Sequence, residues 1–241
     1  MKKFSQEPQI NSLAIFAHRG ASGYYPENTL LAFAKALEQG CDGLEFDVRT
    51  CSRNDEKQLV VFHDKTLDVR THGTGKLKEC DFDYVRSLDV GEGQVIPTLD
   101  EVCTLIGTKA LINIELKEKG TAQLVMDYLL SKPNSIPLQQ YLVSSFCCKE
   151  LKKLRELSSE IKIGVLVGKD YKKGFKRAQK LRAYSIHPNL KTVKQKHIIK
   201  AHSEGLKAFV YTVNSMDDVM RLTRWKVDGI FTDFPDRFQG N

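Results

Sequence analysis

Residues 13–28 read LAIFAHRGASGYYPEN, and they predict a strand, a loop and the start of a helix. The apolar run 13–17 is short and is followed by turn signals, which is typical of a buried strand. Pro26 fits the first turn of the helix, where the missing N–H of proline costs no hydrogen bond. His18 and Arg19 come where the strand ends, and in a barrel of parallel strands this edge carries the chemistry.

His18 and Arg19 together form a candidate phosphate site. An arginine keeps its charge and binds phosphate oxygens, whereas an imidazole can move a proton near neutral pH. A surface turn with two incidental polar residues is the alternative, and this stretch alone leaves it open.

The rest of the chain alternates short β-rich runs with runs of helical spacing, which favours a parallel sheet. Strands are expected at 13–17, 43–50, 58–63, 111–116, 141–145, 162–167, 183–187, 207–213 and 229–232. Helices are expected at 27–39, 98–106, 121–130, 149–157, 171–181, 192–204 and 216–225. About eight such units predict an α/β fold, a single (β/α)8 TIM-barrel domain over residues 1–241. An open doubly wound sheet is the alternative, although no GxGxxG follows the first strand.

A hairpin extension is expected after the second strand. Only the polar loop 52–57 separates the runs 43–50 and 58–63, and this gap is too short for a parallel crossover. Residues 65–97 are rich in turn signals and predict a small insertion over the active-site face. Loops of this length are usually functional or mobile.

The chain is basic, with a formal net charge of +7, and the excess is local. Residues 149–200 hold sixteen Lys and Arg against four Asp and Glu. Basic patches attract anionic partners, but the aromatic residues that stack on bases are few here. We expect a solvated basic face and no nucleic-acid partner. A non-enzymatic barrel that binds nucleic acid or an anionic membrane is the alternative, and the oligomeric state is not determined.

A cytoplasmic location is expected from the cysteines and from the amino-terminal residues. The six cysteines form no CxxC pair, which argues against a zinc ribbon or a redox pair and fits reduced thiols. Polar residues at 5–9 interrupt any signal-peptide apolar region, and no apolar run is long enough to span a membrane. The cysteines are Cys41, Cys51, Cys80, Cys103, Cys147 and Cys148.

Three carboxylates lie on two of the expected strands. Glu45 and Asp47 are two residues apart and therefore share a face, and Glu115 and Lys117 repeat this spacing. Neighbouring buried carboxylates repel each other unless a proton or a cation lies between them. An all-oxygen set suits Mg²⁺ or Ca²⁺ rather than zinc or copper. An internal salt-bridge network, with Glu115 paired to Lys117, is the alternative.

A second imidazole, His63, follows the hairpin arm and returns toward His18. Two histidines that flank a phosphate can act in turn, one taking a proton from the attacking oxygen and one giving a proton to the leaving alcohol. For a lone histidine at a strand end, a packed or capping role is the alternative.

Several motifs in this order resemble the glycerophosphodiester phosphodiesterase family, most closely its soluble bacterial members. The resemblance spans residues 17–235. The shorter motifs are HRG (18–20), ENT (27–29), ExD (45–47), VxHD (61–64) and ExK (115–117). The longer ones are CDGLEFDV (41–48), VYTVN (210–214) and DGIFTDFP (228–235).

The resemblance implies a TIM barrel that hydrolyses glycerophosphodiesters to sn-glycerol 3-phosphate and an alcohol, using a divalent cation, in lipid and glycerol metabolism. It implies acid and base roles for His18 and His63, metal binding by Glu45, Asp47 and Glu115, and substrate binding by Arg19, Lys117 and Tyr211. Tyr211 stands where the family often has Trp, so the preferred alcohol can differ.

Two related activities are alternatives: a lysophospholipase D that releases headgroups, and the phosphoinositide-cleaving phospholipases. The combination of ENT, ExD and ExK favours the glycerophosphodiesterases. Glu27 and Asn28 fit either the site or the first turn of a helix. His187 lies at a predicted strand end, where it either lines the pocket or belongs to a loop without a role in the site.

Overall fold

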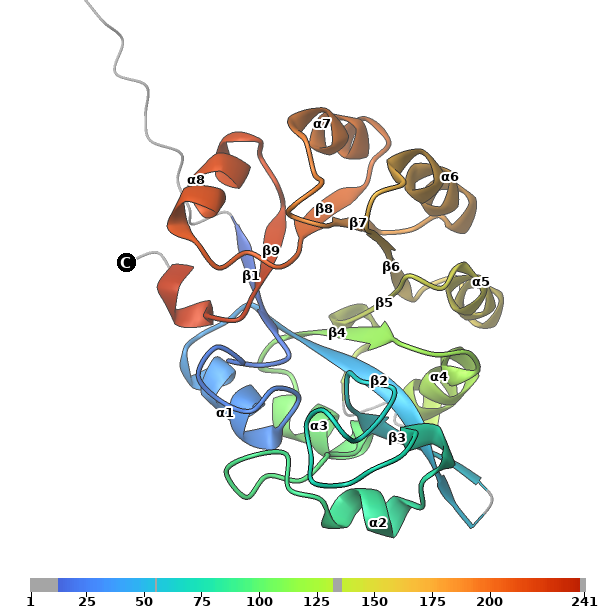
Figure 1. Cartoon of the computed structure of the whole chain (residues 1–241). Helices are drawn as coiled ribbons and strands as arrows, with labels where there is room; N and C mark the ends of the chain where they lie inside the picture. Colours follow the sequence, from blue (N-terminus) through green and yellow to red (C-terminus); the bar gives the residue numbers. More distant parts are fainter. Residues whose placement is uncertain (1–12, 55, 132–135, 239–241) are drawn as a thin grey trace, which may run out of the picture.

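Eight parallel strands close into a barrel with helices around the outside, in a computed structural model that describes residues 13–54, 56–131 and 136–238 (Figure 1). The order is β1-β9-β8-β7-β6-β5-β4-β2, and β1 pairs with β2 to close the ring. The strands are β1 (Ala14–His18), β2 (Gly43–Arg53), β3 (Glu56–Val61), β4 (Leu111–Leu116), β5 (Tyr141–Ser145), β6 (Lys162–Val167), β7 (Ser185–Pro188), β8 (Lys207–Val210) and β9 (Gly229–Thr232). The helices are α1 (Leu30–Glu38), α2 (Phe82–Ser87), α3 (Leu99–Ile106), α4 (Thr121–Ser131), α5 (Cys148–Leu157), α6 (Tyr171–Leu181), α7 (Gln195–Ser203) and α8 (Met216–Arg224). The predicted (β/α)8 barrel is confirmed. The amino-terminal residues used to argue against a signal peptide lie outside the described part.

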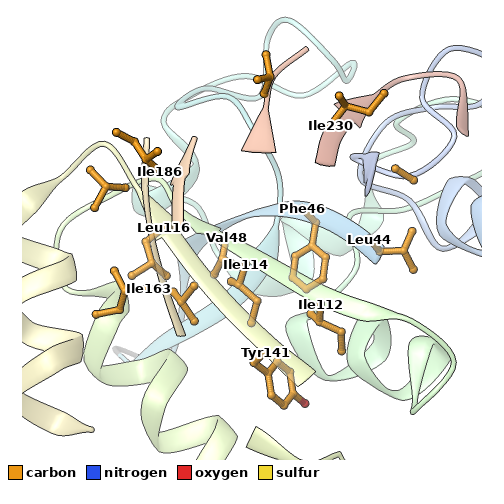
Figure 2. Close-up of a cluster of buried hydrophobic side chains, with 14 of the residues drawn as sticks. Leu44, Phe46, Val48, Ile112, Ile114, Leu116, Tyr141, Ile163, Ile186 and Ile230 are labelled. Carbon is orange, nitrogen blue, oxygen red and sulfur yellow. The ribbon is translucent and has the colours of Figure 1, made fainter. Parts of the chain in front are cut away.

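The main core lies between the barrel and its ring of helices. Alternate residues of each strand face outward, so Leu44 and Phe46 of β2 pack with Ile112 and Ile114 of β4 in this layer (Figure 2). Burying an aliphatic or phenyl side chain stabilises the fold by about 1.5–3 kcal/mol. The same alternation turns the intervening polar residues of both strands into the barrel.

The interior of the barrel has a separate aromatic cluster. The ring of Phe16 lies 5.3 Å from that of Phe209 and 5.2 Å from that of Phe231, and Leu142 completes the buried set. Gly43 faces this cluster, because a Cβ added there would lie 2.4 Å from the Phe16 ring. The aromatic layer fills the barrel below the carboxyl ends of the strands and forms the floor of the site.

The predicted hairpin is confirmed: β2 and β3 pair antiparallel from Val48 with Val61 to Arg53 with Glu56. Residues 65–97 include α2 and pack a second small core against this hairpin. Its buried residues are Cys51, Val60, Phe62, Leu67, Leu77, Phe82, Val85 and Ile96. That residues 65–97 cover the active-site face of a single domain stays a prediction.

One helix start differs from the prediction in a way that matters for the site. The helix expected from residue 27 begins at Leu30, because Asn28 has a left-handed φ of 59° and Thr29 caps the helix by accepting a hydrogen bond from Ala32 N. Glu27 and Asn28 are therefore free to turn toward the barrel mouth. None of the helices in the described ranges is long and apolar enough to span a membrane.

Candidate active site

A pocket of about 350 Å³ opens at the carboxyl ends of the barrel strands. Seven of the eight predicted site residues line it: His18, Arg19, Glu45, His63, Glu115, Lys117 and Tyr211. The eighth, Asp47, is 1% exposed and lies directly beneath the two cations, 3.0 Å from Arg19 Nε and 3.3 Å from Lys117 Nζ. The structure thus brings the whole predicted set to one mouth.

His18 ends β1 and is held by an aspartate from the far end of the chain. Its Nδ1 lies 2.7 Å from Asp233 Oδ1, and Asp233 also accepts hydrogen bonds from Ser22 Oγ at 3.1 Å and from Asn214 Nδ2 at 2.6 Å. Burial lowers the pKa of His18, but the bond to Asp233 and the charge of Glu45 outweigh it and raise the pKa overall. The Asp233 carboxylate accepts from Nδ1–H, so Nε2 is left for the pocket.

His63 has the same pairing in different surroundings. Its Nδ1 lies 2.8 Å from Asp64 Oδ1, and its carbonyl oxygen accepts a hydrogen bond from Arg49 Nε at 2.8 Å. Burial lowers the pKa of His63, and the nearby charges of Arg19 and Lys117 act in the same direction. The two imidazoles therefore differ, since the pKa of His18 is raised and the pKa of His63 is lowered.

The three predicted carboxylates converge. Ligand oxygens of Glu45, Asp47 and Glu115 all lie within 4.8 Å of one another, and all three side chains are buried. Burial and the charge of Asp47 raise the pKa of Glu45 and of Glu115. Burial would also raise the pKa of Asp47, but Arg19 and Lys117 lower it overall. Oxygen ligands that are crowded in this way suit a hard divalent cation.

The salt bridge weighed as an alternative is also present. Lys117 Nζ lies 2.7 Å from Glu115 Oε1, and both Lys117 and Arg19 contact Asp47. Three carboxylates therefore face two cationic side chains, and the pKa of Glu45 is raised to about 8, so a proton or a further cation can balance the third carboxylate. Glu45 is the least neutralised of the three, because among the described residues it accepts a hydrogen bond only from the backbone N of Arg19, at 3.2 Å, and forms no salt bridge. The salt-bridge network and a site for a divalent cation are therefore compatible.

Glu27 and Asn28 take part in the site rather than in a helix turn. Asn28 Nδ2 donates to Asp47 Oδ2 at 3.0 Å, and Glu27 Oε1 accepts from Arg19 Nη1 at 2.9 Å. Arg70, from the insertion, lies 3.1 Å from Glu27. These contacts hold Arg19 and Asp47 in place at the mouth.

The pocket floor includes Asn113 and Ser144, to which the sequence reasoning gave no role, and His187, for which it left a pocket-lining position open. Asn113 of β4 donates through Nδ2 to Ser144 Oγ of β5 at 3.1 Å, and both line the pocket. His187 lines it too, with Nε2 2.8 Å from Ser185 Oγ. An inward position on a barrel strand was the only available signal, since these residues belong to none of the motifs.

Two histidine partners were also missed, although both lay inside motifs. Asp64 is the last residue of VxHD, and Asp233 lies in DGIFTDFP. Asn214 closes the VYTVN motif and donates to Asp233. On the remaining wall, the Tyr211 ring meets the Phe146 ring edge-on at 6.1 Å.

The model of the glycerophosphoryl diester phosphodiesterase family matches residues 18–237. This range runs from the end of β1 to beyond β9 and includes every predicted site residue. The chain belongs to this family. A member of this family is a hydrolase, so the non-enzymatic barrel considered above is wrong, and the expected enzyme class is confirmed.

Curated relatives of this phosphodiesterase match over most of their length. A glycerophosphodiester phosphodiesterase of Caldanaerobacter subterraneus is 33% identical over 239 residues, covering 92% of this chain and 94% of the relative. One from Bacillus subtilis is 32% identical and covers 92% of this chain and 84% of the relative.

Solved structures show the same fold. An Oleispira antarctica phosphodiesterase in complex with the product sn-glycerol-3-phosphate has a TM-score of 0.85 and 27% identity, covering 93% of this chain and 94% of that one. The glycerophosphodiester phosphodiesterase of Thermotoga maritima has a TM-score of 0.78 and 29% identity, covering 94% of this chain and 96% of that one.

Proposed function

We propose that this phosphodiesterase hydrolyses glycerophosphodiesters to sn-glycerol 3-phosphate and an alcohol, with a divalent cation and the His18–His63 pair. The observation that carries the proposal is the convergence of two aspartate-paired imidazoles and three carboxylates on one pocket. The product bound to the Oleispira antarctica relative supports glycerophosphodiesters as the substrate class.

Glu45, Asp47 and Glu115 would hold the cation. The fit rests on their all-oxygen donor set, their mutual approach within 4.8 Å and the excess of one carboxylate over the two cationic side chains, Arg19 and Lys117. Mg²⁺ and Ca²⁺ both match carboxylate ligands. When bound, such an ion stabilises negative charge on the phosphoryl oxygens.

His63 is the proposed base and His18 the proposed acid. A base must be neutral to accept a proton, and burial lowers the pKa of His63. An acid must carry a proton, and the Asp233 bond and the Glu45 charge raise the pKa of His18 against the effect of burial. His63 takes a proton from the attacking hydroxyl as the new P–O bond forms. His18 gives one to the leaving oxygen as the old P–O bond breaks.

Arg19 and Lys117 are the proposed phosphate-binding residues, and Tyr211 forms one wall for the substrate. Both cations line the pocket, and each contacts the buried Asp47, which fixes the charged group. Positioned cations of this kind stabilise the transition-state charge of phosphoryl transfer.

Assays on glycerophosphocholine and glycerophosphoethanolamine test the proposal. Glycerol 3-phosphate should form with Mg²⁺ or Ca²⁺ and disappear with EDTA. His63→Ala should lower kcat by about 10²–10⁴-fold. His72→Ala, which removes an exposed histidine of the insertion, should leave kcat unchanged. Absence of glycerol 3-phosphate with either ion present would contradict the proposed activity.

Two further measurements define the reaction. Rates on a lysolipid and on its deacylated counterpart separate a glycerophosphodiesterase from a lysophospholipase D, and we expect the deacylated substrate to react faster. Phosphorus NMR distinguishes direct attack by water from attack by the 2-hydroxyl of the glycerol, since only the second route forms a cyclic phosphate.

We also infer a cytoplasmic location, supported by six cysteines that are all free thiols, as is usual in reducing compartments. Cell fractionation with antibody detection tests it, and recovery in the medium or in the membrane pellet would contradict it.

A further inference from the structure

The floor of the pocket holds two buried polar atoms without a hydrogen-bond partner among the described residues. They are Asn113 Oδ1 and His187 Nδ1, and their residues are 1% and 0% exposed. Leaving a buried donor or acceptor unpaired costs about 1–3 kcal/mol. Both residues line the pocket, so a ligand that reaches the floor can pair with them.

The orientation of Asn113 is set by a neighbour. Its Nδ2 donates to Ser144 Oγ at 3.1 Å, which directs the amide and leaves Oδ1 as a free acceptor. Asn113 precedes Glu115 by two residues on β4, so both side chains enter the barrel, and Asn113 lies deeper.

The His187 ring rests on the aromatic floor, with centroids 5.6 Å from Phe209 and 5.1 Å from Phe231. Burial lowers the pKa of His187 to about 3, so the ring is neutral and has one N–H. Its Nε2 lies 2.8 Å from Ser185 Oγ. If the Ser185 hydroxyl donates to Nε2, its proton is satisfied and Nδ1–H becomes the free donor.

A glycine keeps the space around this floor open. A Cβ on Gly164 would lie 2.6 Å from the His187 ring and 3.1 Å from Ser144 Cβ. Gly164 pairs with Ser144 on one side and with Ser185 on the other, so β5, β6 and β7 form a continuous strip of inward positions.

We propose that Asn113 and His187 form a hydroxyl-binding subsite that selects the glycerol half of the substrate. A hydroxyl donates one hydrogen bond and accepts others, so the hydroxyls of one ligand can pair with Asn113 Oδ1 and with His187 Nδ1–H. The subsite is uncharged, whereas the phosphate has Arg19 and Lys117 above it. In glycerophosphocholine the choline oxygen is esterified, so only the glycerol half has free hydroxyls. The inference rests on the proposed function.

The test compares glycerophosphocholine with 2-hydroxypropylphosphocholine, which keeps the 2-hydroxyl and lacks only the terminal one, so either route of attack stays open. The wild type should prefer glycerophosphocholine in kcat/KM. Asn113→Leu and His187→Phe, which remove the polar atoms at similar volume, should each lower this preference by about tenfold. Leu166→Ala is the control, since it changes an apolar lining residue and should slow both substrates alike.

A binding measurement needs neither turnover nor a variant. The wild type should be stabilised against heat by sn-glycerol 3-phosphate at lower concentrations than by propyl phosphate. Equal stabilisation by both would overturn the subsite, and so would variants that slow both substrates equally, because the residues would then be structural. If the wild type forms no glycerol 3-phosphate, the proposed function fails, while the binding comparison still decides the subsite.

Discussion

His18 and His63 each carry an aspartate on Nδ1, and their surroundings move their pKa values in opposite directions. For His18 the raising contributions come from Asp233 and Glu45, and they act against burial. Asp233 is 215 residues away along the chain. The two residues meet only when the barrel closes and β9 pairs with β1.

Asp233→Asn is predicted to shift the alkaline limb of the pH profile of kcat/KM to lower pH. The carboxylate raises the pKa of His18, so its removal lowers that pKa, and the protonated acid is lost at a lower pH. Asp236→Asn, an exposed carboxylate bonded to Tyr24, is the control and should leave the limb in place. An unchanged alkaline limb in Asp233→Asn would show that His18 does not act as the acid.

Strand β2 performs two tasks because its residues alternate. Leu44, Phe46 and Val48 pack outward against the helices, while Glu45 and Asp47 face the barrel interior. The strand begins with a glycine because the Phe16 ring occupies the interior at that level, opposite Gly43 in the register. The element therefore carries the carboxylates proposed to hold the cation above a tightly packed aromatic floor.

Gly43→Ala is predicted to lower the free energy of unfolding by about 1–3 kcal/mol, since overpacking a full core forces side chains out of their preferred rotamers. The added Cβ would lie 2.4 Å from the Phe16 ring. Gly168→Ala is the matched control, because nothing lies within 4 Å of its added Cβ and its φ lies outside the left-handed region. Urea unfolding measures both. Equal stabilities for the two variants would disprove the packing account.

At the scale of the whole molecule, a chain with a net charge of +7 keeps a negatively charged cluster at its mouth. Burial and mutual repulsion raise the pKa of Glu45 and of Glu115, so their ionised forms cost stability in the metal-free fold. A folded-state pKa above the unfolded value means that this cost grows as pH rises through neutrality. A cation bound to these carboxylates would offset this cost and so raise the stability of the fold.

Glu45→Gln is predicted to raise the melting temperature of the metal-free protein and to abolish its further rise with Mg²⁺ or Ca²⁺. In the wild type, an ion at 100 times its Kd stabilises the fold by about 2.7 kcal/mol. Since 1 kcal/mol shifts the melting temperature of a chain of this size by roughly 2–4 °C, the ion should raise the melting temperature of the wild type by roughly 5–11 °C. Glu160→Gln, an exposed carboxylate, should leave both values unchanged. If neither millimolar Mg²⁺ or Ca²⁺ nor EDTA changes the melting temperature of the wild type, the metal site is ruled out.

The pattern of residues along the chain was sufficient to predict the barrel and the hairpin, and to place the candidate site residues on the inner face and at the rim of the barrel. Period-two alternation in β2 and β4 assigns Glu45 and Glu115 to the inner face, because successive side chains on a strand point to opposite sides. The end of β1 likewise puts His18 at the rim. These are local properties, and local geometry follows from local sequence.

Folding in three dimensions added the contacts between residues that are distant in the chain. It paired His18 with Asp233, turned Asn28 away from helix α1 and onto Asp47, and left Asn113 and His187 with unpaired atoms on one floor. None of these contacts has a spacing rule in the sequence, because each depends on the closure of the barrel and on which atoms the surrounding packing leaves unsatisfied.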